Sequence, residues 1–277
     1  MQFIKKNRHF VIALALCIVY IILNYAFSLP FYWLLIALFV YALIAVLVSL
    51  PNAAGMTGFL LYSMTKRFEP YEGLMSWGFD RGCNNPATLA GYGLELTKRF
   101  RFERALEAYK RLLEQPDIPP MILKTARQNY SLTQWKCGDI DGAIATMEQM
   151  LVDYEYFSAD FFTTLGFYYL EKKEYEKAVE TTKKALEYDS GNAAAFDNLG
   201  QIAYRQGLFD EARAQFAEAL EHSMTLPDSK YYLGCIAEAE GDPEAAAVFF
   251  RAAAKNKING FNTITPEMLQ EKLSQYC

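Results

Sequence analysis

Histidine is scarce in this chain, with only His9 and His222 among 277 residues. Histidine-based metal sites and nucleophiles activated by a histidine base therefore have almost no material, and we expect both residues to be solvated. The five cysteines lie far apart without a CxxC pair, which argues against a zinc site or a disulfide framework. Glycine patterns of the Rossmann and P-loop types are missing as well. We expect no catalytic residue, no metal, no cofactor and no small-molecule substrate.

Acidic residues are missing from the first fifty positions, where Lys5, Lys6 and Arg8 are the only charged side chains. All 32 acidic residues of the chain therefore lie in the remainder, which has an acidic balance. An acidic surface repels the phosphate backbone of nucleic acids, whose binding needs a clustered Lys/Arg footprint. We expect no nucleic-acid partner.

Two apolar runs without a charged side chain occupy residues 10–27 and 31–50. As helices rising 1.5 Å per residue, each would span about 27 to 30 Å, which matches a bilayer core. Only residues 28–30 separate the runs, so the two helices should be antiparallel neighbours. The sequence therefore predicts a membrane anchor over residues 1–51, a transmembrane hairpin in contact with the lipid bilayer.

Charge predicts the orientation of this hairpin. Lys5, Lys6 and Arg8 flank one open end, Lys66 and Arg67 follow the other, and the turn carries no charge. The positive-inside tendency then places both termini in the cytoplasm, in a multi-pass protein of the cell membrane. A cleaved signal peptide is the alternative interpretation of the first run, although no A-x-A-like site follows and the run is long.

Self-similarity at an interval of about 34 residues marks the rest of the chain. An alanine recurs at Ala105, Ala143, Ala178, Ala212 and Ala246. A small residue precedes each alanine by twelve positions, at Gly93, Ser131, Gly166, Gly200 and Gly234. Four positions after each alanine come Tyr109, Met147, Thr182, Phe216 and Phe250. Small residues are required where the axes of two paired helices come closest. The columns thus predict helical hairpins.

The turn between the two helices of each hairpin has its own marker. Gly138, Gly207 and Gly241 stand at this place in three of the repeats, because glycine accepts positive φ at a helix end. Phe100 and Lys173 stand at the corresponding places in the other two.

These columns resemble the tetratricopeptide repeat, which pairs a Leu-Gly in its first helix with an Ala-x3-Phe in its second. The matching residues are Leu199-Gly200 with Ala212 and Phe216, and Leu233-Gly234 with Ala246 and Phe250. The resemblance covers about five repeats, residues 86–257, and departs at Thr182, Ser131 and Arg127, so the second repeat is expected to pack irregularly. It implies an all-α fold, a transmembrane hairpin followed by an α-solenoid of five to six helix-turn-helix repeats.

Residues 52–85 form a juxtamembrane segment that reads as a sixth, degenerate repeat. Its Thr65–Phe68 echoes Thr97–Phe100, so that Gly73 and Trp77 would occupy the alanine and aromatic columns. Its first helix could equally lie on the lipid surface as an amphipathic stretch.

A capping helix is expected at the end of the solenoid, which we assign to residues 86–277. Thr265 and Pro266 have the character of an N-cap and a first-turn proline, opening a helix that runs to about Gln275. A solenoid needs such a lid because its last repeat otherwise exposes an apolar face.

The resemblance also implies a concave groove, lined by first-helix residues, that binds a polypeptide. Projected onto this chain, the groove comprises Gln128, Asn129, Leu132, Trp135, Phe167, Asp197, Asn198, Gln201, Tyr204, Arg205 and Tyr231, with Lys136 and Cys235 beside them. Aromatics offer contact area and amides can pair with a peptide backbone. The alternative is that the aromatics merely pack between repeats.

A clamp for a free C-terminal carboxylate would need several Lys, Arg and Asn side chains in the groove. Only Asn129, Asn198, Lys136 and Arg205 fit it, in an incomplete pattern, so an internal peptide or helix is the expected ligand.

Together these features predict a membrane-anchored scaffold or adaptor that binds a protein or peptide partner and is not an enzyme. The charged run at 171–177 mixes signs around a turn, which is typical of a solvated corner rather than a catalytic carboxylate pair. Two alternatives stay open: an extracytoplasmic envelope-assembly module, or a non-catalytic subunit of a membrane enzyme or transport complex. The hairpin lacks the intramembrane charge that transport pathways usually show.

Overall fold

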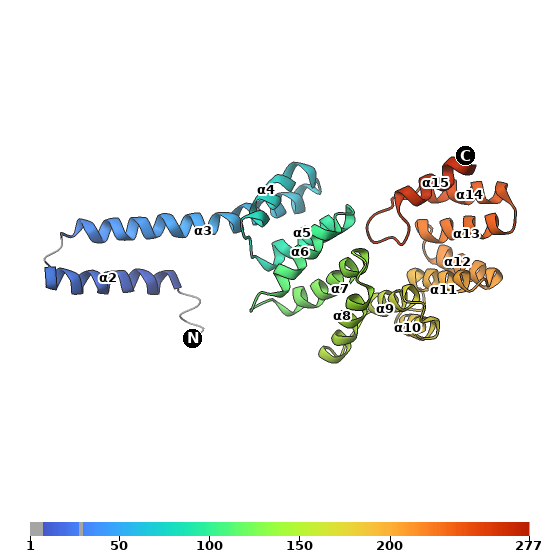
Figure 1. Ribbon diagram of the computed structural model, residues 1–277, viewed down its shortest axis with the longest axis horizontal. Helices are drawn as coiled ribbons and strands as arrows, with labels where there is room; N and C mark the ends of the chain where they lie inside the picture. Colours follow the sequence, from blue (N-terminus) through green and yellow to red (C-terminus); the bar gives the residue numbers. More distant parts are fainter. Residues whose placement is uncertain (1–7, 28–29, 277) are drawn as a thin grey trace. The chain divides into compact units, whose positions relative to one another are not determined.

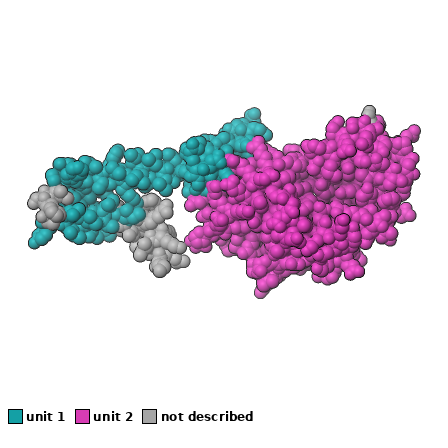
Figure 2. Space-filling model, viewed as in Figure 1, with its two compact units in different colours: residues 1–83 teal, residues 84–277 magenta. Residues whose placement is uncertain are grey.

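The computed structural model describes residues 8–27 and 30–276. Throughout this part of the chain the regular secondary structure is helical, in fourteen helices labelled α2 to α15, which confirms the all-α class. Contacts divide the chain into two compact units, Met1–Cys83 and Asn84–Cys277 (Figure 2). Parts of the predicted segments lie outside the described residues: residues 1–7, which include Lys5 and Lys6, residues 28–29 and residue 277.

Unit 1 opens with α2 (Arg8–Phe27) and α3 (Tyr32–Thr65), which lie side by side (Figure 1). Within the described residues, α3 alone is long and apolar enough to cross a membrane, judged by length and composition. The first predicted span is represented by a shorter apolar stretch, Leu14–Tyr25. One candidate span therefore stands where two were predicted.

The helix that contains the second predicted span is longer than the span itself. The helix α3 continues through Pro51 to Thr65, past the predicted end of the span at residue 50. Proline removes one backbone donor, but the following residues include good helix formers, and α4 packs against this part of α3. A Cβ on Gly78 of α4 would lie only 2.5 Å from the carbonyl oxygen of Pro51, which shows how close the two backbones come.

The helix α4 (Glu69–Asp80) folds back on α3 after Lys66, which adopts a left-handed φ of 58°. The expected column residues of this segment, Gly73 and Trp77, do not occupy buried positions between the two helices. A Cβ on Gly73 would meet nothing within 4 Å, and Trp77 is 37% exposed. Met75 is buried instead, and it packs closely against Gly58 of α3. A Cβ on Gly58 would lie 2.9 Å from the Cγ of Met75. The similarity of Thr65–Phe68 to Thr97–Phe100 would place the turn residue at Phe68, as at Phe100. The left-handed residue is Lys66, two positions earlier, so the predicted column positions are shifted.

Unit 2 consists of five helical pairs and a last helix. The first helices of the pairs are α5 (Pro86–Lys98), α7 (Pro120–Lys136), α9 (Ala159–Glu171), α11 (Ala193–Arg205) and α13 (Pro227–Ala239). The second helices are α6 (Phe102–Leu113), α8 (Ile140–Asp153), α10 (Tyr175–Tyr188), α12 (Phe209–His222) and α14 (Pro243–Ala254). The last helix is α15 (Pro266–Tyr276), whose Met268 amide donates to the Thr265 hydroxyl at 3.2 Å, confirming the predicted N-cap.

The predicted turn residues all adopt left-handed φ. The values are 59° at Phe100, 88° at Gly138, 64° at Lys173, 76° at Gly207 and 78° at Gly241. The five column alanines that follow these turns are completely buried. The turn and the alanine column therefore fix the same geometry in each pair, even where a non-glycine residue must bear the left-handed conformation.

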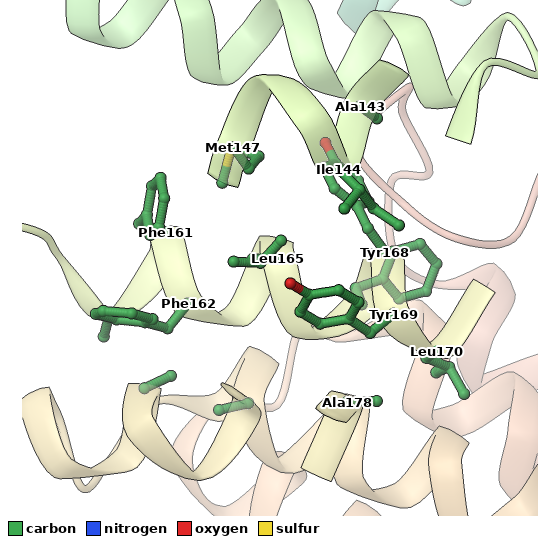
Figure 3. Close-up of a cluster of buried hydrophobic side chains, with 14 of the residues drawn as sticks. Ala143, Ile144, Met147, Phe161, Phe162, Leu165, Tyr168, Tyr169, Leu170 and Ala178 are labelled. Carbon is green, nitrogen blue, oxygen red and sulfur yellow. The ribbon is translucent and has the colours of Figure 1, made fainter. Parts of the chain in front are cut away.

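The small-residue column marks the closest approach within each pair. A Cβ on Gly200 would lie 2.6 Å from the Phe216 ring. At Gly166 the neighbour is Thr182, whose backbone nitrogen would lie only 3.1 Å from that Cβ. The absence of an aromatic at 182 is therefore compensated by closer packing of α9 and α10. Figure 3 shows the apolar residues of α8 and α9 that complete this core.

In the second repeat, Ser131 occupies the small-residue column. Ser131 is completely buried, and its hydroxyl donates to the Gln128 carbonyl at 2.7 Å. The same hydroxyl lies 3.2 Å from the hydroxyl of Tyr168 on α9. Serine fits the small column because both neighbours satisfy its polar atom.

Candidate functional site

A cavity of about 420 Å³ lies in unit 2 on the side of the first helices. Four of these helices, α7, α9, α11 and α13, contribute to its wall, together with the connection between α14 and α15. Its lining residues are Gln128, Asn129, Leu132, Trp135, Asp160, Thr163, Thr164, Phe167, Tyr168, Ala194, Asp197, Asn198, Leu226, Asp228, Phe261, Asn262 and Thr263. We call this surface the groove.

The groove brings together most of the residues projected from the sequence: Gln128, Asn129, Leu132, Trp135, Phe167, Asp197 and Asn198. They come from α7, α9 and α11, which repeat the same face at each step of the array. Four other predicted residues, Gln201, Tyr204, Arg205 and Tyr231, do not line the cavity.

Trp135 is the best-anchored aromatic of the groove. Its indole N–H donates to Glu171 at 3.1 Å, and its ring meets Phe167 edge-on with centroids 4.7 Å apart. The ammonium of Lys136 lies 3.9 Å from the Trp135 ring centroid, within the range of a cation–π contact. Its neighbours thus fix the orientation in which this ring lines the cavity.

Tyr204 packs between repeats, as the alternative interpretation proposed. The ring of Tyr204 lies 5.2 Å from that of Tyr232. Tyr231 packs within the last helical pair, where it is buried with its ring 5.6 Å from Phe250 of α14. The helical projection missed this because it predicts the side of the helix on which a residue lies, but not which residue of a neighbouring helix contacts it there.

The four residues that suggested a carboxylate clamp do not assemble into one. The amide of Asn198 donates to the Thr163 carbonyl at 2.7 Å, and Arg205 pairs with Glu171. Lys136 donates to the backbone carbonyl of Asn262 at 2.6 Å. Because these donors already have partners within the chain, the arrangement does not favour a free carboxylate.

The connection between α14 and α15, residues 255–265, lies in the groove, and we call it the strap. Asp228 of α13 is its main anchor. One carboxylate oxygen accepts the Thr263 N–H at 2.7 Å, the Thr263 hydroxyl at 2.6 Å and the Ile264 N–H at 3.0 Å. The other oxygen accepts the Asn262 side-chain amide at 2.6 Å. A buried carboxylate is stable here because donors surround it.

The strap also reaches the opposite end of the array (Figure 1). The Gly260 N–H donates to the Lys98 carbonyl at the end of α5, at 3.3 Å. A Cβ on Gly260 would lie 1.8 Å from the Thr97 carbonyl oxygen, so only glycine fits. The strap therefore joins the last helical pair of unit 2 to the first.

Burial shifts the pKa values of two side chains near the strap, Asp197 and Lys136. Asp197 accepts from Ser229 and from the Gln201 amide at 2.7 Å, and burial together with the nearby charge of Asp228 raises its pKa to about 7. Burial lowers the pKa of Lys136 to about 8, against the attraction of Asp228 and Glu171. Among the described residues, no group of His, Cys, Asp and Glu is placed to hold a metal ion.

Sequence reasoning missed Asp228 and the strap. The usable signal was the Asn/Gly-containing connection at 255–265, which is long for a link between two helices. Asp160 and Thr164 were missed although they lie on α9 within two turns of Phe167.

Comparison with known proteins identifies the helical pairs. One family model, described as tetratricopeptide repeat, matches residues 198–260, and another with the same description matches 159–192. These two segments, which include most of α9 to α14, therefore match the tetratricopeptide repeat. No curated protein matches the chain.

Several solved structures are similar to this chain. A thermophilic TPR protein of Thermus thermophilus is 18% identical, with 69% of this chain and 98% of that chain covered, at a TM-score of 0.58. MamA is 20% identical, covering 66% and 97%, at 0.43. YrrB, described as a TPR protein with an unusual peptide-binding site, is 20% identical, covering 69% and 92%, at 0.40. The first of these likenesses shows a TPR-type solenoid fold.

Proposed function

We propose that this protein is a membrane-attached adaptor whose TPR solenoid binds a partner polypeptide in the groove, on the cytoplasmic side. The observation that carries the proposal is the cavity itself. Side chains from four successive first helices converge on it, and they combine aromatic rings with amides and hydroxyls. Such a surface offers contact area from the rings and pairing for a peptide backbone.

The proposed attachment rests on unit 1. The helix α3 has the length and composition of a membrane span, and the apolar stretch of α2 lies beside it. The proposed orientation rests on Lys66 and Arg67, which follow α3, and on the basic residues that precede α2. In this arrangement α2 and α3 form a hairpin with both ends in the cytoplasm.

Photo-crosslinking in intact cells tests the groove. A photoreactive phenylalanine replaces Leu132, which lines the cavity, and in a matched variant it replaces Val248, which is 61% exposed on α14. We expect a discrete crosslinked protein from position 132 and none of that mass from position 248. The same products from both positions, or none from 132, would contradict the proposal.

Alkaline carbonate extraction tests the attachment. The full chain should remain with the membrane pellet, whereas a chain lacking residues 1–50 should appear in the supernatant. Release of the full chain by carbonate would contradict a membrane-spanning α3.

A further inference from the structure

The strap lies in the groove as a bound peptide would. Its Asn262 carbonyl accepts from Lys136 on α7, and its Thr263 and Ile264 amides donate to Asp228 on α13. Main-chain groups therefore carry much of the contact, as they do when an extended segment binds a protein surface.

Side chains of the strap add a second layer of recognition. The amide of Asn262 and the hydroxyl of Thr263 both donate to Asp228, at 2.6 Å each. The Gln201 amide on α11 lies 3.4 Å from the same hydroxyl. Three helices thus converge on two consecutive strap residues, an amide followed by a hydroxyl.

The Asp228 carboxylate requires hydrogen-bond donors from whichever segment lies against it. Its side chain is 5% exposed, and a buried carboxylate without donors is strongly unfavourable. Any segment that replaces the strap must therefore bring equivalent N–H and O–H groups to Asp228. This selects the chemistry of the partner.

The middle of the strap, residues 261–263, is held mainly by polar contacts that another segment can reproduce. Phe261, its largest apolar side chain, is 38% exposed, and Gly260 contributes no side chain. The open cavity borders the strap at Phe261, Asn262 and Thr263, so an incoming chain can bind next to it before displacing it. Ile264 is buried beside α15 and keeps the end of the strap attached.

We propose that Lys136, Gln201 and Asp228 form a recognition site for an extended partner segment that carries an amide residue followed by a hydroxyl residue, and that the strap is an internal surrogate which this segment displaces. The inference rests on the proposed function, because it takes the groove to hold a polypeptide. The strap then competes with the partner for this site, so a partner must supply equivalent donors to displace it.

The test uses the full chain in detergent micelles and a fluorescent peptide with the strap sequence Ile-Asn-Gly-Phe-Asn-Thr-Ile-Thr. In the unlatched protein, Asn262→Ala is combined with Thr263→Val, which removes two strap donors and leaves Lys136, Gln201 and Asp228 unchanged. Fluorescence anisotropy should show peptide binding to the unlatched protein at least about tenfold tighter than to the wild type, where the strap competes. A peptide carrying the same Ala and Val substitutions should bind weakly to both.

Two further variants sharpen the result. Adding Asp228→Ala to the unlatched protein should abolish peptide binding, because the acceptor is lost. Hydrogen exchange at the Thr263 and Ile264 amides reports whether the strap is released, and circular dichroism reports folding. If exchange stays slow, Gly260→Leu is added, since a side chain there collides with Thr97.

Equal binding of the native and substituted peptides would overturn the inference, as would failure of a released, folded protein to bind the native peptide. The crosslink from position 132 separates this outcome from failure of the proposed function. A crosslinked partner without strap-peptide binding refutes only the surrogate role. Loss of both results refutes the groove itself.

Discussion

The carboxylate of Asp228 accepts both the backbone N–H and the hydroxyl of Thr263, at 2.7 and 2.6 Å, across 35 positions of sequence. This pair fixes the strap against the fourth of the groove helices, α13. It also leaves the carboxylate dependent on donors that belong to no helix of the array.

Replacing Asp228 with asparagine should destabilise unit 2. One carboxamide oxygen can still accept from Thr263, but the new amide group faces the Asn262 amide, donor against donor. Hydrogen bonds to a charged group each contribute about 1.5–3 kcal/mol, so we expect a loss of that order in the free energy of unfolding, measured by urea titration. Asp210→Asn is the control, because that side chain is fully exposed, and its midpoint should not move.

The stability of unit 2 should fall as pH rises from about 4 to about 7. Burial and the charge of Asp228 raise the pKa of Asp197 to about 7, so the folded state retains a proton that the unfolded chain has released above about pH 4. Unfolding therefore releases a proton in this window, and a higher pH favours it, by at most about 1.4 kcal/mol per pH unit. Asp197→Asn should flatten the dependence between pH 4 and 7. An unchanged slope in that variant would assign the effect to another group.

Enlarging the alanine column should separate paired helices. Ala212 is completely buried between α11 and α12, whereas Ala217 is exposed on the same helix. Ala212→Leu should lower the free energy of unfolding by about 1–3 kcal/mol through overpacking. Ala217→Leu should change it by no more than about 0.5 kcal/mol. Thermal unfolding followed by circular dichroism compares the two, and equal melting temperatures would argue against the packing role of the column.

Thiol labelling should report the side of the membrane on which the solenoid lies. Cys137 is exposed, whereas Cys235 is buried and its pKa is raised to about 11 by that burial, so it reacts slowly. In a Cys277→Ser background, a membrane-impermeant maleimide should leave Cys137 unmodified in intact cells and modify it after permeabilisation. Modification in intact cells would favour the extracytoplasmic alternative. Cys137→Ser provides the blank.

The sequence predicted the repeat array well because the same two structural requirements recur in each repeat. The left-handed turn residues and the buried alanines recur together in every pair, so even Lys173 was recognised by position where glycine is absent. The column at Thr182 also held, because closer backbones replaced the missing ring.

The groove could be predicted only for residues whose contacts follow from the side of their own helix on which they lie. Leu132 and Trp135 line the cavity as projected, whereas Tyr204, on the same side of α11, meets Tyr232 of the next pair. The strap was beyond this reasoning, since its contacts join Asp228 to Thr263 and Gly260 to Lys98 without any periodic signal. In unit 1, the similarity of Thr65–Phe68 to Thr97–Phe100 assigned Gly73 to a helix contact that it does not make.

The bond from Gly260 to the end of α5 bears on how this array can evolve and unfold. Open solenoids tolerate the insertion or loss of a module, and they fray from their terminal modules inward because each one touches only its neighbours. Here a change in module number would carry Gly260 away from Thr97, so the count is fixed by the span of a single loop. Fraying at one end must also break a contact at the other, which couples the two ends and should sharpen the unfolding transition.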